Sequence, residues 1–242
     1  MTAPRPAFYA LRRGGWRDLI TLLHPPYTVW HLSYVALGAA AAPQVHADRL
    51  GAALGAFFLA VGISAHAFDE LNGHPLQTAL GPRFLLGLGV AGLVGALAIG
   101  VAGVFIVSPA LIALVVLGTI LVPAYNLEWG GGRLHNDATF ALAWGAFPAF
   151  TGYFVNSLAI RPAGILVAAA CYLLSVAQRR LSTPVRELRR HTIALSGEQC
   201  LDDGRVETIT SDSVREPLER ALSALWLALV LLAAGLTVVR LS

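Results

Sequence analysis

Long stretches of this chain carry almost no charged side chain, and this feature limits the folds open to it more than any other. Of its 242 residues, 56% are hydrophobic and only 13% are charged, and the mean hydropathy is +0.66. A membrane-spanning helix needs roughly 20 mostly apolar residues, because the hydrocarbon core of a bilayer is about 30 Å thick. The sequence therefore predicts an all-α membrane protein rather than a water-soluble domain.

Seven segments are apolar and long enough to be candidate spans. They are residues 27–43, 50–67, 84–105, 109–125, 138–155, 162–178 and 218–239. We expect them to form one integral membrane domain over residues 1–242, a polytopic bundle of about seven transmembrane helices. The sequence His24-Pro25-Pro26 precedes any long apolar core, so we expect no cleavable signal peptide and a first span that stays as an anchor.

The basic residues, all of them arginine, indicate the orientation of the bundle. If the N-terminus is cytoplasmic, 14 of the 17 arginines fall in cytoplasmic segments, and only Arg49, Arg161 and Arg240 fall outside. Such an excess of positive charge is typical of the cytoplasmic side of membrane proteins. We therefore expect a multi-pass protein of the cell membrane. A basic face beside anionic lipid accounts for the net charge of +3, so we expect no nucleic acid partner.

With this topology the polar loops gather on one side. Segments 68–83, 126–137 and 179–217 are cytoplasmic, whereas the outer loops are short. Ionisable groups at the edge of the bilayer core are costly and usually functional, so this asymmetry indicates a polar chamber at the cytoplasmic face. Segment 191–217 also has an Asp203-Gly204 turn signal, which predicts a polar hairpin that serves either as a lid or as a solvated linker.

The first candidate site closes the second span. His66, Glu70 and His74 are spaced four residues apart and Asp69 follows His66 by three, so a continuous helix would place them on one face. Two imidazoles and two carboxylates are suitable ligands for a divalent metal, including iron or zinc. The Asn-Gly-His-Pro sequence at 72–75 is a helix stop, however, and it can turn His74 away from that face.

The second cluster follows the fourth span, on either side of the glycines at 130–132. Glu128, His135 and Asp137 can complete a metal site or contact a substrate head group. Asp137 has a second interpretation, as the N-cap of the fifth span, where a carboxylate accepts free amide protons.

The third cluster is basic and follows the sixth span. Arg186 and Arg190 are one helical turn apart, and a guanidinium binds phosphate through two parallel hydrogen bonds. Ser182 or Thr183 before Pro184 predicts the start of a short amphipathic helix. The alternative is an arginine stripe that rests on anionic lipid head groups.

Four segments resemble parts of the UbiA superfamily of intramembrane prenyltransferases. The similarity extends over roughly residues 20–190. Residues 24–28 (HPPYT) resemble the start of that family's first helix. Residues 65–76 (AHAFDELNGHPL) stand where its first aspartate-rich motif closes the second helix, and they end in a similar Pro-Leu pair. Tyr125 and residues 142–148 (LAWGAFP) resemble the connection between its fourth and fifth helices.

The resemblance implies an all-helical membrane fold with a cytoplasm-facing chamber, a lipid-side opening, and Mg²⁺-assisted ionisation of an isoprenyl diphosphate. The chain departs from the family in three respects. Histidines stand at 66 and 74 in the first motif, the basic segment 182–190 replaces the second aspartate-rich motif, and about seven spans replace the usual nine.

We therefore expect an integral membrane transferase that uses a divalent metal to act on an isoprenoid or other membrane lipid. The expected catalytic residues are Asp69, Glu70 and Tyr125. The expected substrate-binding residues are Arg186, Arg190, Asn126 and Ser182. The expected metal ligands are His66, Asp69, Glu70, His74, Glu128, His135 and Asp137.

Two other functions stay open at this point. One is a metal-dependent membrane oxidoreductase or hydrolase in which His66, His74 and His135 bind iron or zinc. The other is a non-enzymatic transporter or assembly factor whose polar end binds a cargo or a partner.

Overall fold

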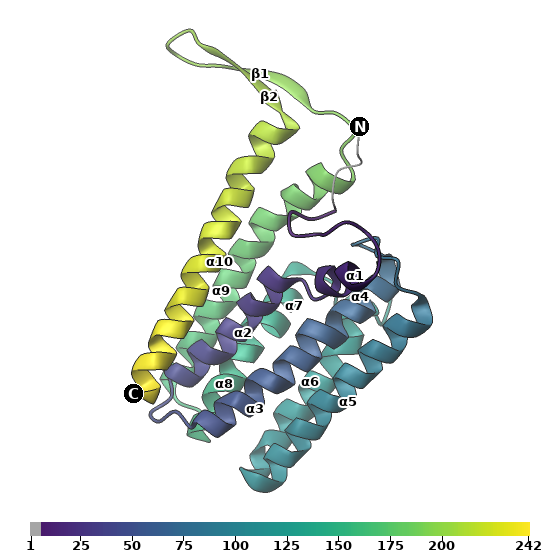
Figure 1. Cartoon of the computed structure of the whole chain (residues 1–242). Coiled ribbons are helices and arrows are strands. Elements are labelled where there is room, and N and C mark those ends of the chain that lie inside the picture. The colour runs from purple at the N-terminus through teal and green to yellow at the C-terminus, as the bar shows by residue number, and fades with distance from the viewer. Residues whose placement is uncertain (1–5) are drawn as a thin grey trace.

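The computed structural model describes residues 6–242, and its long helices lie side by side in one bundle from which a β-hairpin projects (Figure 1). In chain order the elements are α1 (Trp16–Leu22), α2 (Pro25–Ala40), α3 (Ala47–Phe57), the π-helical segment η1 (Phe58–Ala65), α4 (His66–Gly73), α5 (Pro82–Ile106), the 3₁₀ turn η2 (Pro109–Leu111), α6 (Ile112–Asn126), α7 (Asp137–Ala141), the π-helical segment η3 (Leu142–Ala146), α8 (Phe147–Ser157), α9 (Pro162–Arg190), β1 (Ser196–Cys200), β2 (Val206–Thr210) and α10 (Ser211–Leu241).

Within residues 6–242, six helical stretches are long and apolar enough to cross a membrane, which confirms the prediction of a helical membrane protein. They are Ala47–Gly73, Pro82–Ile106, Pro109–Asn126, Asp137–Ser157, Pro162–Arg190 and Ser211–Leu241. The remaining predicted span, residues 27–43, corresponds to α2, which has 16 residues. At 1.5 Å per residue α2 rises about 24 Å, which is less than the thickness of the hydrocarbon core.

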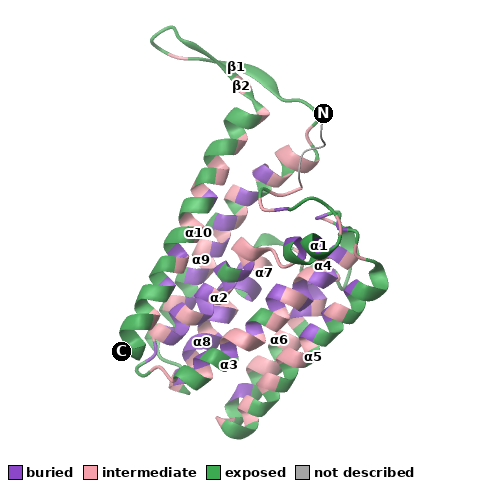
Figure 2. Cartoon of the chain, viewed as in Figure 1, coloured by how far each residue is buried: buried purple, intermediate pink, exposed green. Residues whose placement is uncertain are grey.

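Most residues of α2 are nevertheless buried or partly buried, because the helix packs against α8 and α10. Its Gly38 lies against the backbone of Ala149, and Gly152 of α8 lies against the backbone of Val35, so neither glycine has room for a methyl group. Small residues at such crossings let helix backbones approach closely. Buried residues therefore concentrate on α2 and α8, whereas α5 and α10 are largely exposed (Figure 2).

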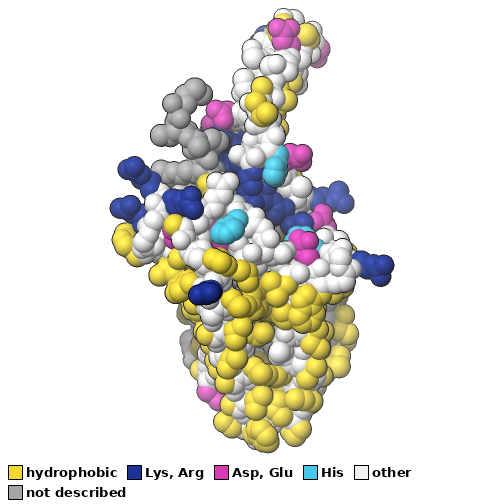
Figure 3. All heavy atoms as spheres, turned by 90° about the vertical axis from the view of Figure 1, so that its right-hand side faces the viewer, with side chains coloured by type: hydrophobic (Ala, Val, Ile, Leu, Met, Phe, Trp, Pro, Cys, Tyr) yellow, Lys and Arg dark blue, Asp and Glu magenta, His cyan; other side chains and the backbone are white. Residues whose placement is uncertain are grey.

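Most charged side chains in this view gather at one end of the molecule, and apolar side chains cover most of the remaining visible surface (Figure 3). We call this the polar end: it carries α1, the loop between α4 and α5, and the turn between α6 and α7 (Figure 1). Exposed apolar residues such as Phe105 and Ile106 lie toward the other end, at the C-terminus of α5. This division matches the one-sided distribution of polar loops that the sequence predicts.

The predicted hairpin in segment 191–217 is present. Strands β1 and β2 pair in antiparallel register, with Ser196 opposite Thr210, and Gly204 in the turn has a φ of +84°. The hairpin extends away from the bundle, beyond the ends of α9 and α10 (Figure 1). Helix α10 begins at Ser211, before the predicted start of the last span at residue 218.

The prediction that a new helix begins at Ser182 or Thr183 is wrong, because α9 continues through this region to Arg190. Pro184 lies inside the helix, although a proline there removes a backbone hydrogen bond and its ring crowds the carbonyl group four residues before it. The turns around it are preserved, and the Ser182 hydroxyl bonds to the carbonyl oxygen of Arg179 at 3.4 Å. As a result, the arginines between 179 and 190 are carried by a single helix.

Candidate functional site

A cavity of about 160 Å³, which we call the chamber, opens at the polar end. Its wall combines the polar ends of α2, α4, α6, α9 and α10 with the N-terminal segment 6–9. The ionisable side chains in this wall are Tyr9, His24, Tyr27, His31, His66, Asp69, Tyr125, His135, Arg179, Arg186, Arg189, Arg190 and Glu219. Segments far apart in the sequence thus meet around one space.

The chamber includes most of the residues that the sequence singles out. His66 and Asp69 come from the first cluster. Tyr125, Asn126 and His135 come from the second cluster, and Ser182, Arg186 and Arg190 come from the third. His66 is the first residue of α4 and follows the π-helical segment η1, a kind of helix that is frequent at functional sites. Its ring stacks on that of His24, with centroids 4.2 Å apart.

Glu70 does not line the chamber. Its carboxylate is fully buried and accepts hydrogen bonds from the amides of Leu76 (2.9 Å) and Thr78 (2.8 Å) and from the Thr78 hydroxyl (2.8 Å). His74 Nδ1 lies 3.1 Å from the same carboxylate. Because α4 ends at Gly73 and His74 has a φ of +48°, the chain turns away there, so the predicted metal-binding face is interrupted. Glu70 and His74 hold the loop that follows α4.

Glu128 and Asp137 also lie outside the chamber wall. The Glu128 side chain is 48% exposed, and it lies 3.8 Å from His135 Nδ1. Asp137 is 60% exposed and forms an ion pair of 2.7 Å with Arg179. The N-cap expected at Asp137 is made by Asn136, whose side-chain oxygen accepts from the Thr139 amide at 2.9 Å.

The donor set does not fit the expected metal centre. Within residues 6–242, no three His, Cys, Asp or Glu side chains are grouped so that they could hold a metal ion. The chamber wall contains two carboxylates, and that of Glu219 is paired with Arg189 at 2.6 Å. Asp69 is the other carboxylate that the described residues bring to the wall, and one carboxylate is the smallest number that Mg²⁺ sites on phosphate ligands commonly use.

Arg186 and Arg190 bring positive charge to the chamber, and neither forms an ion pair with any residue from 6 to 242. Arg186 donates to the Thr183 hydroxyl on its own helix at 3.0 Å, and Arg190 donates to the carbonyl oxygen of Pro6 at 3.1 Å. A guanidinium has five N–H donors, so both side chains keep donors for an anion.

Two buried oxygen atoms of the chamber wall have no hydrogen-bond partner in the described part of the chain. They are the Tyr125 hydroxyl and the side-chain oxygen of Gln178. The Tyr125 ring is held by stacking on His135, with centroids 4.6 Å apart. Because buried polar atoms are nearly always hydrogen-bonded, these two oxygens are available to a water molecule or a polar group in the chamber.

The N-terminal segment is the part of the site that sequence reasoning missed. Residues 6–9 cover one side of the chamber, and the Tyr9 hydroxyl bonds to His24 Nδ1 at 2.8 Å. Burial raises the pKa of Tyr9, and burial together with the neighbouring His66 lowers the pKa of His24. The sequence gives no periodic pattern before α1 that would place this segment; the aromatic pair Phe8-Tyr9 is the only available signal.

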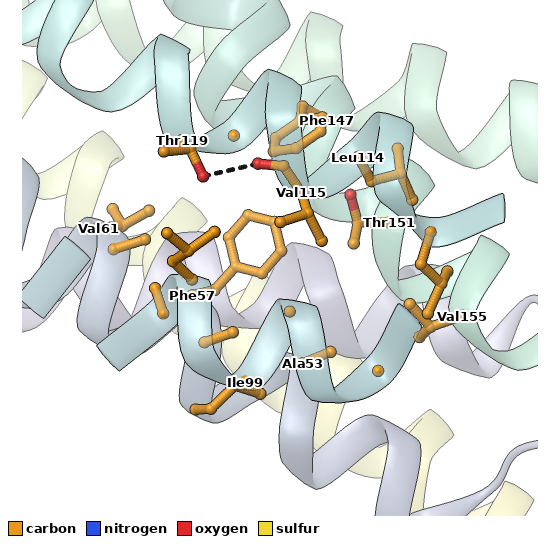
Figure 4. A pocket seen from close by; sticks show the side chains of 18 of the residues that line it. Ala53, Phe57, Val61, Ile99, Leu114, Val115, Thr119, Phe147, Thr151 and Val155 are labelled. Carbon is orange, nitrogen blue, oxygen red and sulfur yellow. Dashed lines mark hydrogen bonds between the residues drawn. The ribbon is translucent and has the colours of Figure 1, made fainter. Parts of the chain in front are cut away.

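A second cavity, of about 150 Å³, lies between α3, η1, α5, α6 and α8 and is lined mainly by their apolar side chains. We call it the apolar cavity. Phe57, Val115 and Phe147 lie around it (Figure 4). Val61 and Trp144 line both the apolar cavity and the chamber, so the two spaces adjoin at these residues.

No family model, curated protein or solved structure matches this chain.

Proposed function

We propose that this protein is an integral membrane enzyme that transfers a prenyl or other lipid group from a phosphate-bearing donor bound in the chamber. The observation that carries the proposal is the pair of chamber arginines, Arg186 and Arg190, that have no ion-pair partner in the described chain. Both side chains are partly buried, and removing a cation from water without a counter-ion is costly, so a chamber that keeps two of them is suited to an anionic ligand.

The position of the chamber supports a lipid substrate. It lies where apolar, membrane-length helices give way to the polar end, so a lipid head group can enter it while the chain stays in apolar surroundings. The resemblance of residues 65–76 and 142–148 to UbiA-like prenyltransferases supports an isoprenoid donor. The arginine excess at the polar end supports a cytoplasmic location for this end and for the N-terminus.

In such a transfer, the bond between the first prenyl carbon and the diphosphate oxygen breaks, and both electrons leave with the diphosphate. A new bond forms between that carbon and a nucleophilic atom of an acceptor, which releases a proton. Arg186 and Arg190 stabilise the charge on the departing diphosphate, because fixed cations are most effective where negative charge develops. Asp69 lines the same chamber and accepts the proton.

The remaining expected residues take different parts in this scheme. The Tyr125 hydroxyl, which has no hydrogen-bond partner among residues 6–242, donates to an oxygen of the ligand, and Asn126 and Ser182 shape the wall. Glu70 supports the loop after α4 instead of acting on the substrate. Charge neutralisation is assigned to arginine because the carboxylates do not form a multi-ligand metal site.

Binding of inorganic diphosphate to the purified full chain in detergent micelles tests the proposal. Arg186→Ala and Arg190→Ala should each weaken binding about 10- to 100-fold, since a charge-assisted hydrogen bond contributes roughly 1.5–3 kcal/mol. Arg220→Ala is the matched control, because Arg220 is 80% exposed and paired with Glu216 on α10. Unchanged affinity in both chamber variants would contradict the proposal.

Turnover provides the second test. With a prenyl diphosphate and an acceptor, Asp69→Asn should abolish product formation and leave diphosphate binding intact. Normal turnover in this variant would remove Asp69 from the mechanism.

A further inference from the structure

We infer that α1 is an interfacial helix: its outward face enters the head-group layer of the bilayer, and the arginines beside it bind anionic phospholipid. We call this surface the α1 face, and it consists of the exposed residues Trp16, Leu19 and Ile20. The inference is independent of the chemistry proposed for the chamber, because none of these three residues lines the chamber.

Helix α1 has its polar and apolar sides reversed relative to a helix on the surface of a water-soluble protein. Asp18 and Thr21 are each only 3% exposed, so the polar side is turned toward the rest of the chain. Trp16, Leu19 and Ile20 are spaced three and four residues apart on the other side, with exposed fractions of 64%, 40% and 38%. A helix beside water normally buries its apolar stripe, so this arrangement suits an apolar surrounding.

Hydrogen bonds on the buried side fix α1 in this orientation. The Asp18 carboxylate accepts from the amide of Gly14 at 3.0 Å and from the amide of Ala79, in the loop before α5, at 2.9 Å. The Thr21 hydroxyl accepts from the amide of Leu11 at 3.0 Å. A rotation of α1 that hid its apolar side would break these bonds and expose Leu22, so the α1 face is a stable feature of the surface.

The neighbours of α1 place it where the chain enters the bilayer. Leu22 packs in one buried cluster with Ala67 of α4 and Leu85, which lies in the first turn of α5. Helix α5 has 25 residues and rises about 38 Å, whereas the hydrocarbon core is about 30 Å thick. The ends of α5 therefore reach the head-group layers, and α1 lies beside one of these ends.

Arginines make the surroundings of the α1 face positive. Within residues 6–242, four exposed arginines of this region form no ion pair: Arg12, Arg13, Arg17 and Arg83. The guanidinium of Arg17 lies 5.8 Å from the centre of the Trp16 ring. Tryptophan at the head-group level, apolar side chains below it and arginines for phosphate groups are the composition of an interfacial helix. The charge complements that of an anionic phospholipid.

The depth of the α1 face can be measured with nitroxide labels on the full chain in vesicles of equal parts phosphatidylcholine and phosphatidylglycerol. Cys200→Ser removes the exposed cysteine, Cys171 is buried, and Leu19→Cys introduces the labelled position. Val94→Cys on α5 is the reference for the bilayer core, and Ile193→Cys before the hairpin is the reference for water, since both positions are exposed. The Leu19 label should collide with dissolved oxygen more often, and with a water-soluble nickel complex less often, than the Ile193 label.

A Leu19 label that is as accessible to the nickel complex as the Ile193 label would overturn the inference, because the α1 face would then lie in water. Ile20→Cys repeats the measurement on the same face with a second variant, which keeps the test open if Leu19→Cys does not fold.

Spin-labelled lipids test the preference for anionic phospholipid. The original chain should immobilise a larger fraction of spin-labelled phosphatidylglycerol than of spin-labelled phosphatidylcholine. Arg12→Gln combined with Arg17→Gln should lower this preference at least about twofold, because each arginine near an anionic surface attracts it. Arg205→Gln combined with Arg220→Gln is the matched control, since both of these exposed arginines are already ion-paired.

Two results of the lipid experiment would overturn the inference. One is an original chain that immobilises both lipids to the same extent. The other is a preference for phosphatidylglycerol that the two double variants retain equally, which would place the anionic lipid at other arginines.

Discussion

The backbone amide and the hydroxyl of Thr78 both donate a hydrogen bond to the same carboxylate oxygen of Glu70, and each donor–acceptor distance is 2.8 Å. The other oxygen of that carboxylate accepts from the Leu76 amide. Glu70 is therefore an anchor for the loop after α4, although its neighbour Asp69 lines the chamber. Two adjacent carboxylates thus have separate roles, one structural and one at the site.

This difference leads to the first prediction. Glu70→Ala should lower the free energy of unfolding by about 3 kcal/mol or more, because buried donors on Leu76 and Thr78 lose their acceptor. A thermal shift of the purified protein in detergent measures the effect. Glu207→Ala, in the exposed hairpin, is the control and should leave the midpoint unchanged. A Glu70→Ala protein as stable as the original would show that the loop is held by other contacts.

The second prediction concerns the crossing of α2 and α8. Gly38→Ala should destabilise the bundle, because the new methyl group meets the backbone of Ala149, which cannot move like a side-chain end. Gly51→Ala on α3 is the matched control, since nothing lies within 4 Å of its added methyl group. That control should be neutral or stabilising by up to about 1 kcal/mol, owing to the higher helix propensity of alanine. Equal midpoints for Gly38→Ala and Gly51→Ala would contradict the close packing.

The fold could be predicted from the sequence to the extent that it depends on local composition. Each apolar run specifies its own helix, because a membrane-spanning segment must satisfy its backbone groups internally. The path through Pro184 was not predictable in this way, because the surrounding turns of α9 compensate for one missing amide. The cap at Asn136 instead of Asp137 is a one-residue difference between two side chains of similar capping strength.

The site could be predicted only in part, for a related reason. Spacing on a helix identified His66, Asp69, Arg186 and Arg190, which do line the chamber. The same spacing included Glu70 and His74. The helix stop at 72–75 was predictable from its Asn-Gly-His-Pro sequence, but the use of the Glu70 carboxylate to hold the loop after it was not. Tyr9 enters the chamber through a tertiary contact with His24, and no local pattern specifies such a contact.

The third prediction concerns metal removal. If Arg186 and Arg190 supply the positive charge, inorganic diphosphate should bind the purified chain equally well before and after chelation with EDTA. Calorimetric titration in both conditions provides the measurement, with Arg186→Ala as the variant in which binding should be weak throughout. Loss of binding on chelation that added Mg²⁺ restores would show that a cation completes the site.

The fourth prediction is a dependence of stability on pH through His24. Its pKa is lowered well below the ordinary value of 6.5 by burial, with a further contribution from His66. At pH values above about 6.5 the ring is neutral in both the folded and the unfolded chain and has no effect. Below that value the unfolded chain binds a proton that the folded chain does not, so stability should fall as the pH decreases, by up to about 1.4 kcal/mol per pH unit.

His24→Asn should reduce this dependence, because asparagine does not titrate and still offers an acceptor to the Tyr9 hydroxyl. The measurement is the unfolding midpoint at about pH 7 and about pH 5 for the original protein and the variant. His191→Asn, at the exposed end of α9, is the control and should retain the full acid sensitivity. The remaining charged neighbours of His24 include Arg190 and Arg186, whose positive charges also oppose its protonation. If His24→Asn loses stability toward acid as steeply as the original chain, the sensitivity arises from another group.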